Sequence, residues 1–450
     1  MLAWVLVFVG SGCEQEKAPP NIIFILADDL GYSQIGCYGT SYYETPNIDG
    51  LAKEGMRFTN AYAAASICSP TRASIMTGKY PARLHLTNYI PGTNKEFRLR
   101  QPDWQKFLPL EEVTFAEVLK ERGYRTSIFG KWHLSIEKAP PQSLPYNPDK
   151  QGFDEHFVTY KPSGKVLQSW QDAENDAHNV DTITNLALDF IERNQSEPFM
   201  LFVSHNSIHD PLMERREAIR KYEQKGGADR PENNPILGAM IERLDKSCGA
   251  IFQKVKELGL DDNTIIIFFA DNGGLETDAA QTPLRRGKGW LYEGGIKEPL
   301  IVKWKGKVTP GTTSSALVSS IDFLPTFLEV AGITDVPSGV DGRSFVPALR
   351  DPEAEVHSKL FWHFPHYHNG PPSGAIRMGD WKLIELFEES ILNGRKQAFE
   401  LYNLASDIGE STNLADSLEA KTAELALALE DWRNEVKAQL MIENSQFSEE

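Results

Sequence analysis

The sequence predicts an α/β fold in which a mostly parallel central sheet is flanked by helices, with a smaller α+β subdomain at the C-terminal end. Four apolar runs carry this prediction, because each is rich in Ile, Val and Phe, has strand length and lacks strict polar-apolar alternation. Strands buried on both faces of a parallel sheet have this composition. The runs are residues 21–27, 124–130, 199–203 and 264–270.

Helix signals lie between these runs, and such alternation is typical of a doubly wound sheet. Thr114 and Glu117 form a capping box ahead of an amphipathic stretch that reaches Arg122, and Gly123 follows as a stop signal. Further helices are predicted over residues 182–193, 238–258 and 322–330.

Polar side chains directly follow each of the apolar runs. In open α/β sheets the ligand site lies beyond the carboxyl ends of the strands, so these side chains are expected to meet at one edge. They are Asp28 and Asp29 after the first run, Lys131 and His133 after the second, His205 and His209 after the third, and Asp271 and Asn272 after the fourth.

The length of 450 residues predicts one large domain and a smaller one. A composition shift near residues 347–356 divides a catalytic domain, 18–350, from a C-terminal subdomain, 351–450. In that subdomain an apolar stripe, Leu425, Leu429, Trp432 and Val436, predicts a last helix that packs against a small antiparallel sheet.

The formal net charge of −17 argues against nucleic acid or an anionic membrane surface as a partner. Residues 1–9 form an apolar run too short to span a bilayer, and small residues then precede Cys13. Residues 1–17 therefore resemble a secretory or lipoprotein export segment with its linker. We expect an exported protein, periplasmic or in the cell envelope, with lipid attachment and membrane anchoring at Cys13 as one alternative and a frayed apolar terminus as the other.

The most specific motif is residues 68–78, CSPTRASIMTG. Pro70 suits the first turn of a helix, which would place Cys68 at a helix N-terminus and Arg72 four residues on, along the same face. The alternative is a buried thiol that merely precedes Ser-Pro. The motif resembles the C-x-P-[ST]-R signature of the type I sulfatases, followed by Thr-Gly.

The resemblance implies that a formylglycine-generating or anaerobic maturation enzyme oxidises Cys68 to formylglycine. The hydrated aldehyde, a geminal diol, is the nucleophile in that family, and it avoids a second attack at sulfur because sulfate leaves as the aldehyde re-forms. If Cys13 and Cys68 are modified, Cys37 and Cys248 remain, and we expect buried thiols rather than a disulfide framework.

A metal site is predicted from the oxygen donors of Asp28, Asp29, Asp271 and Asn272. Adjacent carboxylates are costly without a cation, and an all-oxygen set favours a hard ion, Ca²⁺ or Mg²⁺. The resemblance adds residue 68 to the ligands and favours Ca²⁺ over Mg²⁺.

Three further segments resemble sulfatase motifs: Gly-Lys-Trp-His at 130–133, His-x-Pro at 209–211, and the glycine-rich segment 287–299. The resemblance implies an alkaline phosphatase-like fold. It also implies that the catalytic residues are Cys68, Arg72, Lys131, His133, His209 and Lys288, with Arg72 holding an oxygen of the diol.

The predicted function is hydrolysis of a sulfuric ester, with a sulfated small molecule or glycan as substrate. The loop 363–372 is rich in groups that stack on sugars, so His363, His366 and Arg377 are predicted to bind a sulfated carbohydrate. A solvated loop between strands is the alternative. Two other functions stay open: a phosphonate or phosphodiester hydrolase, and a glycan-binding surface protein whose Cys68 is not converted.

Overall fold

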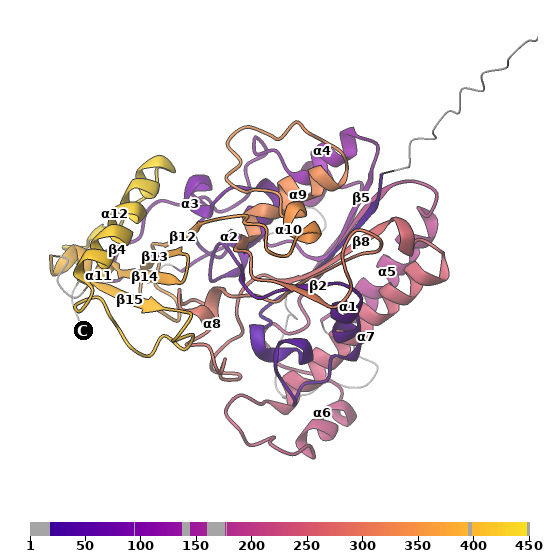
Figure 1. The fold of residues 1–450 in the computed structure, drawn as a ribbon, viewed down its shortest axis with the longest axis horizontal. Coiled ribbons are helices and arrows are strands. Elements are labelled where there is room, and N and C mark those ends of the chain that lie inside the picture. Colours follow the sequence, from indigo (N-terminus) through magenta and orange to yellow (C-terminus); the bar gives the residue numbers. More distant parts are fainter. Residues whose placement is uncertain are drawn as a thin grey trace, which may run out of the picture.

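The structure is a computed structural model that describes residues 19–93, 95–136, 145–159, 176, 178–394 and 398–447. Its centre is an eight-stranded sheet in the order β10-β2-β9-β8-β1-β7-β5-β6 (Figure 1). Apart from β9, which runs antiparallel to β8 and β2, neighbouring strands are parallel. The strands are β1 (Asn21–Ala27), β2 (Met56–Phe58), β5 (Arg125–Lys131), β6 (Glu155–Thr159), β7 (Phe199–His205), β8 (Thr264–Ala270), β9 (Leu300–Trp304) and β10 (Thr312–Ser314). The predicted fold class is therefore confirmed.

Helices cover both faces of this sheet (Figure 1). One layer consists of α2 (Cys68–Thr77), α4 (Phe115–Glu121), α9 (Phe323–Val330) and α10 (Val346–Arg350). The other consists of α1 (Pro46–Glu54), α5 (Val180–Arg193), α6 (Arg216–Glu223) and α7 (Pro235–Glu257). Two short helices, α3 (Pro81–Leu84) and α8 (Glu293–Ile296), complete this part, as do β3 (Ala61–Tyr62) and β11 (Val318–Ser319), which pair with each other.

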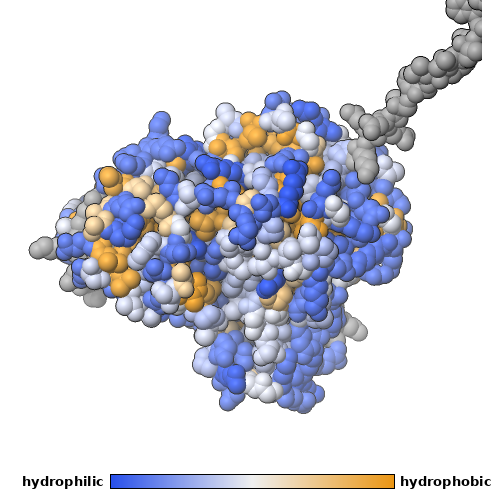
Figure 2. Space-filling model, viewed as in Figure 1, coloured by the Kyte–Doolittle hydropathy of each residue, from blue (hydrophilic) through white to orange (hydrophobic). Residues whose placement is uncertain are grey.

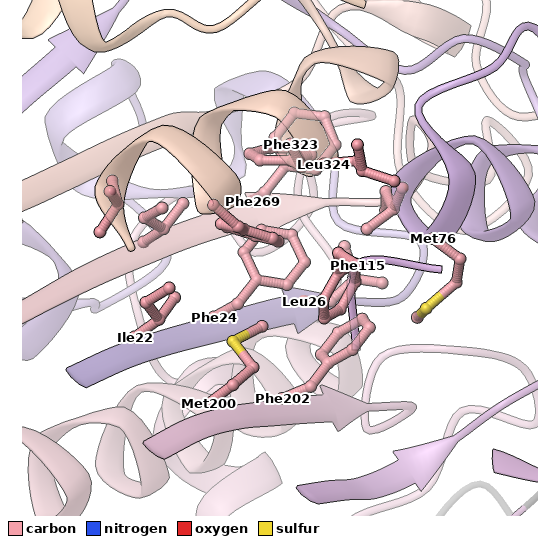
Figure 3. Close-up of a cluster of buried hydrophobic side chains, with 14 of the residues drawn as sticks. Ile22, Phe24, Leu26, Met76, Phe115, Met200, Phe202, Phe269, Phe323 and Leu324 are labelled. Atoms are coloured by element: carbon pink, nitrogen blue, oxygen red, sulfur yellow. The ribbon is translucent and has the colours of Figure 1, made fainter. Parts of the chain in front are cut away.

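Alternate residues of β1 enter two different cores. Ile22, Phe24 and Leu26 pack into the first core (Figure 3), whereas Ile23 and Ile25 pack into the second. In Figure 3, Phe24 lies among aromatic side chains from β7, β8 and α9. Every residue of β1 is buried, so the absence of polar alternation in the sequence reflects burial on both faces.

The central strands end in register. Ala27, the last residue of β1, lies opposite His205 of β7 and Ala270 of β8. The residues that follow these strands therefore emerge side by side, as the sequence predicted.

Two predicted helices begin earlier than expected. Helix α7 begins at Pro235, because the Asn234 side chain accepts hydrogen bonds from the backbone N–H groups of Ile236 and Leu237. Helix α5 begins at Val180 rather than at residue 182. The Thr114 capping box is present at α4 as predicted.

The C-terminal part contains an antiparallel sheet in the order β12-β13-β14-β15, at the left of Figure 1. Its strands are Lys359–Phe364, Ser373–Met378, Trp381–Leu386 and Phe399–Asn403. The predicted last helix is α12 (Glu419–Glu435), which packs on this sheet through Leu425 and Leu429. Helix α11 (Phe387–Leu392) follows β14, and β16 (Ile442–Glu443) pairs with β4 (Leu99–Arg100).

The face of the molecule in Figure 2 is mostly hydrophilic, with scattered apolar patches. No helix in the described ranges combines the length and apolar character that crossing a bilayer requires. Cys37 and Cys248 are free thiols, as expected, although Cys37 is only partly buried. Cys13 and the predicted export segment, 1–17, lie outside the described residues.

Candidate active site

A cavity of about 470 Å³ opens at the carboxyl edge of the large sheet. Groups from distant parts of the chain line it, because β1, β5, β7, β8 and α2 all end or begin there. The lining residues are Asp28, Cys68, Tyr89, Ile90, Pro91, Lys131, His133, His209, Asp210, Leu275, Thr277, Asp278, Lys288, His368 and Asn369.

Cys68 is the first residue of helix α2, as Pro70 predicted. The helix ends where Gly78 adopts a left-handed conformation with φ of 69°, a conformation that favours glycine. The Cys68 Sγ lies 3.5 Å from Asp28 Oδ1 and 3.4 Å from Lys288 Nζ. Burial opposes ionisation of the thiol, but the nearby ammonium groups of Lys131 and Lys288 lower the pKa of Cys68 overall.

Three carboxylates surround Cys68. One ligand atom each from Asp28, Asp29, Cys68 and Asp271 lies within 4.8 Å of the others. The Asn272 Oδ1 is buried without a hydrogen-bond partner among the described residues, while its Nδ2 donates to Asp29 Oδ1 at 2.7 Å. Burial and the Asp28 carboxylate raise the pKa of Asp271 well above its usual value. An unpartnered amide oxygen beside crowded carboxylates fits a hard divalent cation, so the predicted metal ligands are brought together.

Each carboxylate is also paired with a basic side chain. Lys131 Nζ lies 2.8 Å from Asp28 Oδ2, Lys288 Nζ 2.7 Å from Asp29 Oδ1, and Arg72 Nη2 2.7 Å from Asp271 Oδ2. Burial would raise the pKa of Asp28, but Lys131, with smaller contributions from His209, Arg72 and Lys288, holds it well below its usual value.

Arg72 lies in the same cluster of buried charges. Its guanidinium is buried and donates to Asp271, to the Lys131 carbonyl and to Ser204 Oγ, the last two at 2.8 and 2.7 Å. These bonds hold the guanidinium against Asp271 and the ends of β5 and β7, so Arg72 helps to fix the position of Asp271. Its bond to an oxygen of the diol stays a prediction, because residue 68 is an unmodified cysteine in this structure.

Two of the predicted histidines, His133 and His209, face the cavity. His133 Nε2 donates to the Ile90 carbonyl at 2.7 Å, which makes Nδ1 the acceptor when the ring is neutral. His209 Nε2 lies 3.8 Å from Asp29 Oδ2. Burial and the two lysines oppose protonation of His209, but Asp29 and Asp28 raise its pKa overall. His205 is outside the cavity lining and bonds Ser247 Oγ at 2.9 Å.

Backbone geometry at the site is unusual. Asp29 and His133 have positive φ angles of 63° and 58°, and such conformations concentrate at functional sites. The glycine-rich segment holds Lys288 by close backbone packing: a Cβ at Gly287 would lie 2.3 Å from the Gly274 carbonyl oxygen, and one at Gly294 would lie 2.1 Å from that of Arg286. No side chain fits there.

The predicted substrate-binding residues need correction. His363, His366 and Arg377 are buried outside this cavity. His363 bonds the Gln439 carbonyl, His366 bonds Thr87 and Gln101, and Arg377 bonds Tyr62 and Asn60. The contacts of His366 and Arg377 join the C-terminal part to the rest of the molecule, whereas that of His363 stays within the C-terminal part.

The loop between β12 and β13, which contains His366, nevertheless reaches the cavity through His368 and Asn369, and the sequence analysis did not select these two residues. Asn369 Nδ2 donates to the Lys288 carbonyl at 2.9 Å. The prediction also missed Tyr89, Asp210 and Asp278. Asp210 could have been suspected, since it lies inside the His-x-Pro motif, whereas no local pattern marks Asp278.

Comparison with known proteins agrees with this geometry. A family model for sulfatases matches residues 20–333, and one for the C-terminal region of N-sulphoglucosamine sulphohydrolase matches residues 286–439. Human arylsulfatase A is 32% identical, with 94% of this chain and 88% of the relative covered. A sulfatase of Formosa agariphila is 30% identical, with 95% and 89% covered.

Solved structures of similar fold include one with a carbohydrate bound and one from glycosaminoglycan metabolism. The structure of Ps i-CgsB in complex with k-i-k-neocarrahexaose has a TM-score of 0.75 and 28% identity, with 92% of each chain covered. A glycosaminoglycan-metabolism sulfatase of Bacteroides thetaiotaomicron also has a TM-score of 0.75, with 26% identity and coverage of 92% of this chain and 99% of that one. With its family match, its relatives and its clustered motif residues in agreement, the chain belongs to the sulfatase family.

Proposed function

We propose that this sulfatase removes sulfate from a sulfated carbohydrate, with formylglycine made from Cys68 as the source of the nucleophile and Ca²⁺ as the metal. The main support for this proposal is the position of Cys68 Sγ, which lies within 4.8 Å of ligand atoms from three buried carboxylates. A thiol with only a packing role would not need such surroundings.

The site's own residues suit sulfuryl transfer. When present, the hydrated aldehyde supplies the attacking oxygen, and the cation supplies positive charge beside the transferring group. Lys131 and Lys288 lie on either side of Asp28, Asp29 and Cys68, where their ammonium groups can stabilise negative charge on the sulfate oxygens.

The histidines divide the proton transfers. His209, whose pKa is raised, can donate a proton to the oxygen of the leaving alcohol. His133 lines the cavity, and in the neutral ring its Nδ1 is the basic nitrogen, which can take a proton from residue 68 as sulfate departs.

A carbohydrate substrate is supported by the relatives. Human N-acetylgalactosamine-6-sulfatase is 33% identical, with 76% of this chain and 67% of the relative covered, and Ps i-CgsB is seen with a neocarrahexaose. The cavity, at about 470 Å³, has the size of a small-molecule site.

The proposal includes maturation and export. Conversion of Cys68 requires a formylglycine-generating or anaerobic maturation enzyme, and we place the mature protein in the periplasm or cell envelope. The apolar run 1–9 before Cys13 supports export. Lipid attachment at Cys13 would add membrane anchoring.

Rates measured with one enzyme preparation on sulfate and phosphorus esters distinguish a sulfatase from a phosphorus-ester hydrolase. We expect turnover of an aryl sulfate and of at least one member of a panel of sulfated mono- and polysaccharides, with much slower turnover of an aryl phosphate and a phosphodiester. Preferred hydrolysis of the phosphorus esters would replace the proposal with a phosphonate or phosphodiester hydrolase. Carbohydrate binding without turnover, in protein with unmodified Cys68, would indicate a glycan-binding protein.

A further inference from the structure

Two carboxylates of the cavity have no part in the reaction described above. Asp210 follows His209 and is exposed, and Asp278 lies beyond the Asp271–Asn272 turn and is half-buried. Both line the cavity with Cys68. Within the described ranges, neither carboxylate forms a hydrogen bond or an ion pair. Unpaired carboxylates inside an enzyme cavity are available to a ligand.

These two groups repel each other. Burial raises the pKa of Asp278 to about 6. The neighbouring carboxylates of Asp210 and Asp29 add to this increase, and His209 and Lys288 oppose it. Hydrogen-bond donors supplied by a substrate would relieve the repulsion, whereas a third negative charge would increase it.

The part of the cavity lined by His368 and Asn369 offers Asp210 and Asp278 no cation. His368 has its pKa lowered to about 4, first by burial and then by Lys288, so its ring is neutral at ordinary pH, and it packs edge-on against Tyr89 at 5.4 Å. Asn369 beside it is uncharged. Among the described lining residues, the lysines are at the buried end, with Lys131 and Lys288 only 5% and 7% exposed. The two lysines thus lie at the buried inner end of the cavity, whereas its more open part carries Asp210 and Asp278, with His209 beside Asp210 as a basic group.

We propose that Asp210 and Asp278 determine specificity: they accept hydrogen bonds from uncharged hydroxyl groups of the sugar near the sulfated carbon and exclude substrates with a second anionic group there. Carboxylates are strong acceptors for hydroxyl donors. A like charge placed against them costs binding energy, which is how many sites reject competitors. This inference rests on the proposed function, because it concerns the alcohol part of a sulfate ester.

A charge series of aryl sulfates tests it without knowledge of the natural sugar. Three substrates would carry a hydroxymethyl, an aminomethyl or a carboxylate substituent at the same ring position. For the wild type we expect kcat/KM to be lowest for the carboxylate, mainly through KM. In Asp210→Asn/Asp278→Asn the ratio of carboxylate to hydroxymethyl kcat/KM should rise roughly tenfold, the scale of one charged interaction.

Matched controls separate this effect from the general field of the protein. Glu276→Gln removes one negative charge from the same loop, but Glu276 pairs with Arg286 and lies outside the cavity lining. The ratio of carboxylate to hydroxymethyl kcat/KM in this variant should therefore equal that of the wild type. Added salt should reduce the discrimination of the wild type because exposed charges are screened. The single variants Asp210→Asn and Asp278→Asn, with their melting temperatures, show whether a change reflects folding.

The outcomes are distinct. Equal kcat/KM ratios in the wild type and the double variant, or no discrimination by the wild type, would overturn this inference while leaving the sulfatase reaction intact. Failure of converted protein to hydrolyse any of the three sulfates would overturn the proposed function, and with it the inference.

Discussion

At the scale of single residues, the site is a set of buried opposite charges. Asp28, Asp29 and Asp271 are each paired with a different basic side chain. Removing one partner of a buried pair leaves an uncompensated charge, which is far more costly than the pair itself is stabilising. The same side chains that we propose for catalysis therefore also bear on stability.

Lys288 connects the nucleophile position with Asp29. Lys288→Ala should lower kcat by about 10²–10³, the usual cost of removing one group that stabilises transition-state charge. Initial rates with an aryl sulfate measure the loss, and thermal unfolding checks the fold. Lys305→Ala is the matched control, since Lys305 is an exposed lysine after β9 at the opposite edge of the sheet. Equal rates for the Lys288 variant and the wild type would remove Lys288 from the mechanism.

The metal can be tested by its removal. Chelation should abolish turnover and lower the melting temperature, because three buried carboxylates within 4.8 Å of one another lose their cation. Ca²⁺ should restore both properties better than Mg²⁺, which demands a tighter octahedral geometry. Full activity after chelation, with metal content measured by mass spectrometry, would contradict the assignment.

Local patterns predicted the residues at the strand ends because a parallel sheet delivers them to one edge. The other residues that line the cavity, such as His368, were missed because their position depends on long-range packing. His366 and His368 are two residues apart in one loop, yet His366 is buried against Thr87 and His368 lines the cavity. No spacing rule separates the two.

At the scale of elements, the strands could be predicted from their apolar composition because both faces of the sheet are buried. The first residues of the helices depend instead on capping side chains. Asn234 moved the start of α7 to Pro235. In the capping box of α4, Thr114 and Glu117 are three residues apart, so sequence alone predicted it.

Helix α12 offers a matched pair of leucines. Leu429 is fully buried against the C-terminal sheet, whereas Leu427 is 61% exposed on the same helix. Leu429→Ala should lower the free energy of unfolding by about 2–5 kcal/mol, and Leu427→Ala by less than about 0.5 kcal/mol. Chemical denaturation measures both, and similar values for the two variants would contradict the packing of α12.

At the scale of the whole molecule, the C-terminal sheet is joined to the active-site segment through buried charges. Lys382 of β14 lies 2.9 Å from Glu293 Oε1 and 2.8 Å from Glu410 Oε1, and all three side chains are fully buried. Glu293 begins the Glu-Gly-Gly turn five residues after Lys288. The sheet therefore helps to hold the lysine segment, which composition alone did not predict.

Lys382→Met tests this connection. It should cost about 3–5 kcal/mol of unfolding free energy, because Glu410 would lose its cation and Glu293 would keep only its longer pair with Lys297, at 3.7 Å. Adding Glu410→Gln should recover part of the loss, since one of the two charges is removed. Denaturation curves of both variants measure the effect, and an unchanged curve for Lys382→Met would show that the network carries no stability.

The central claim is that the oxidised side chain at position 68 performs the reaction. Preparations with different degrees of maturation can be compared by the mass of the peptide that contains Cys68, in which one oxygen replaces sulfur and two hydrogens, and by their turnover of an aryl sulfate. We expect activity proportional to the converted fraction and none in Cys68→Ala. Full activity in unconverted protein, or in Cys68→Ala, would contradict it.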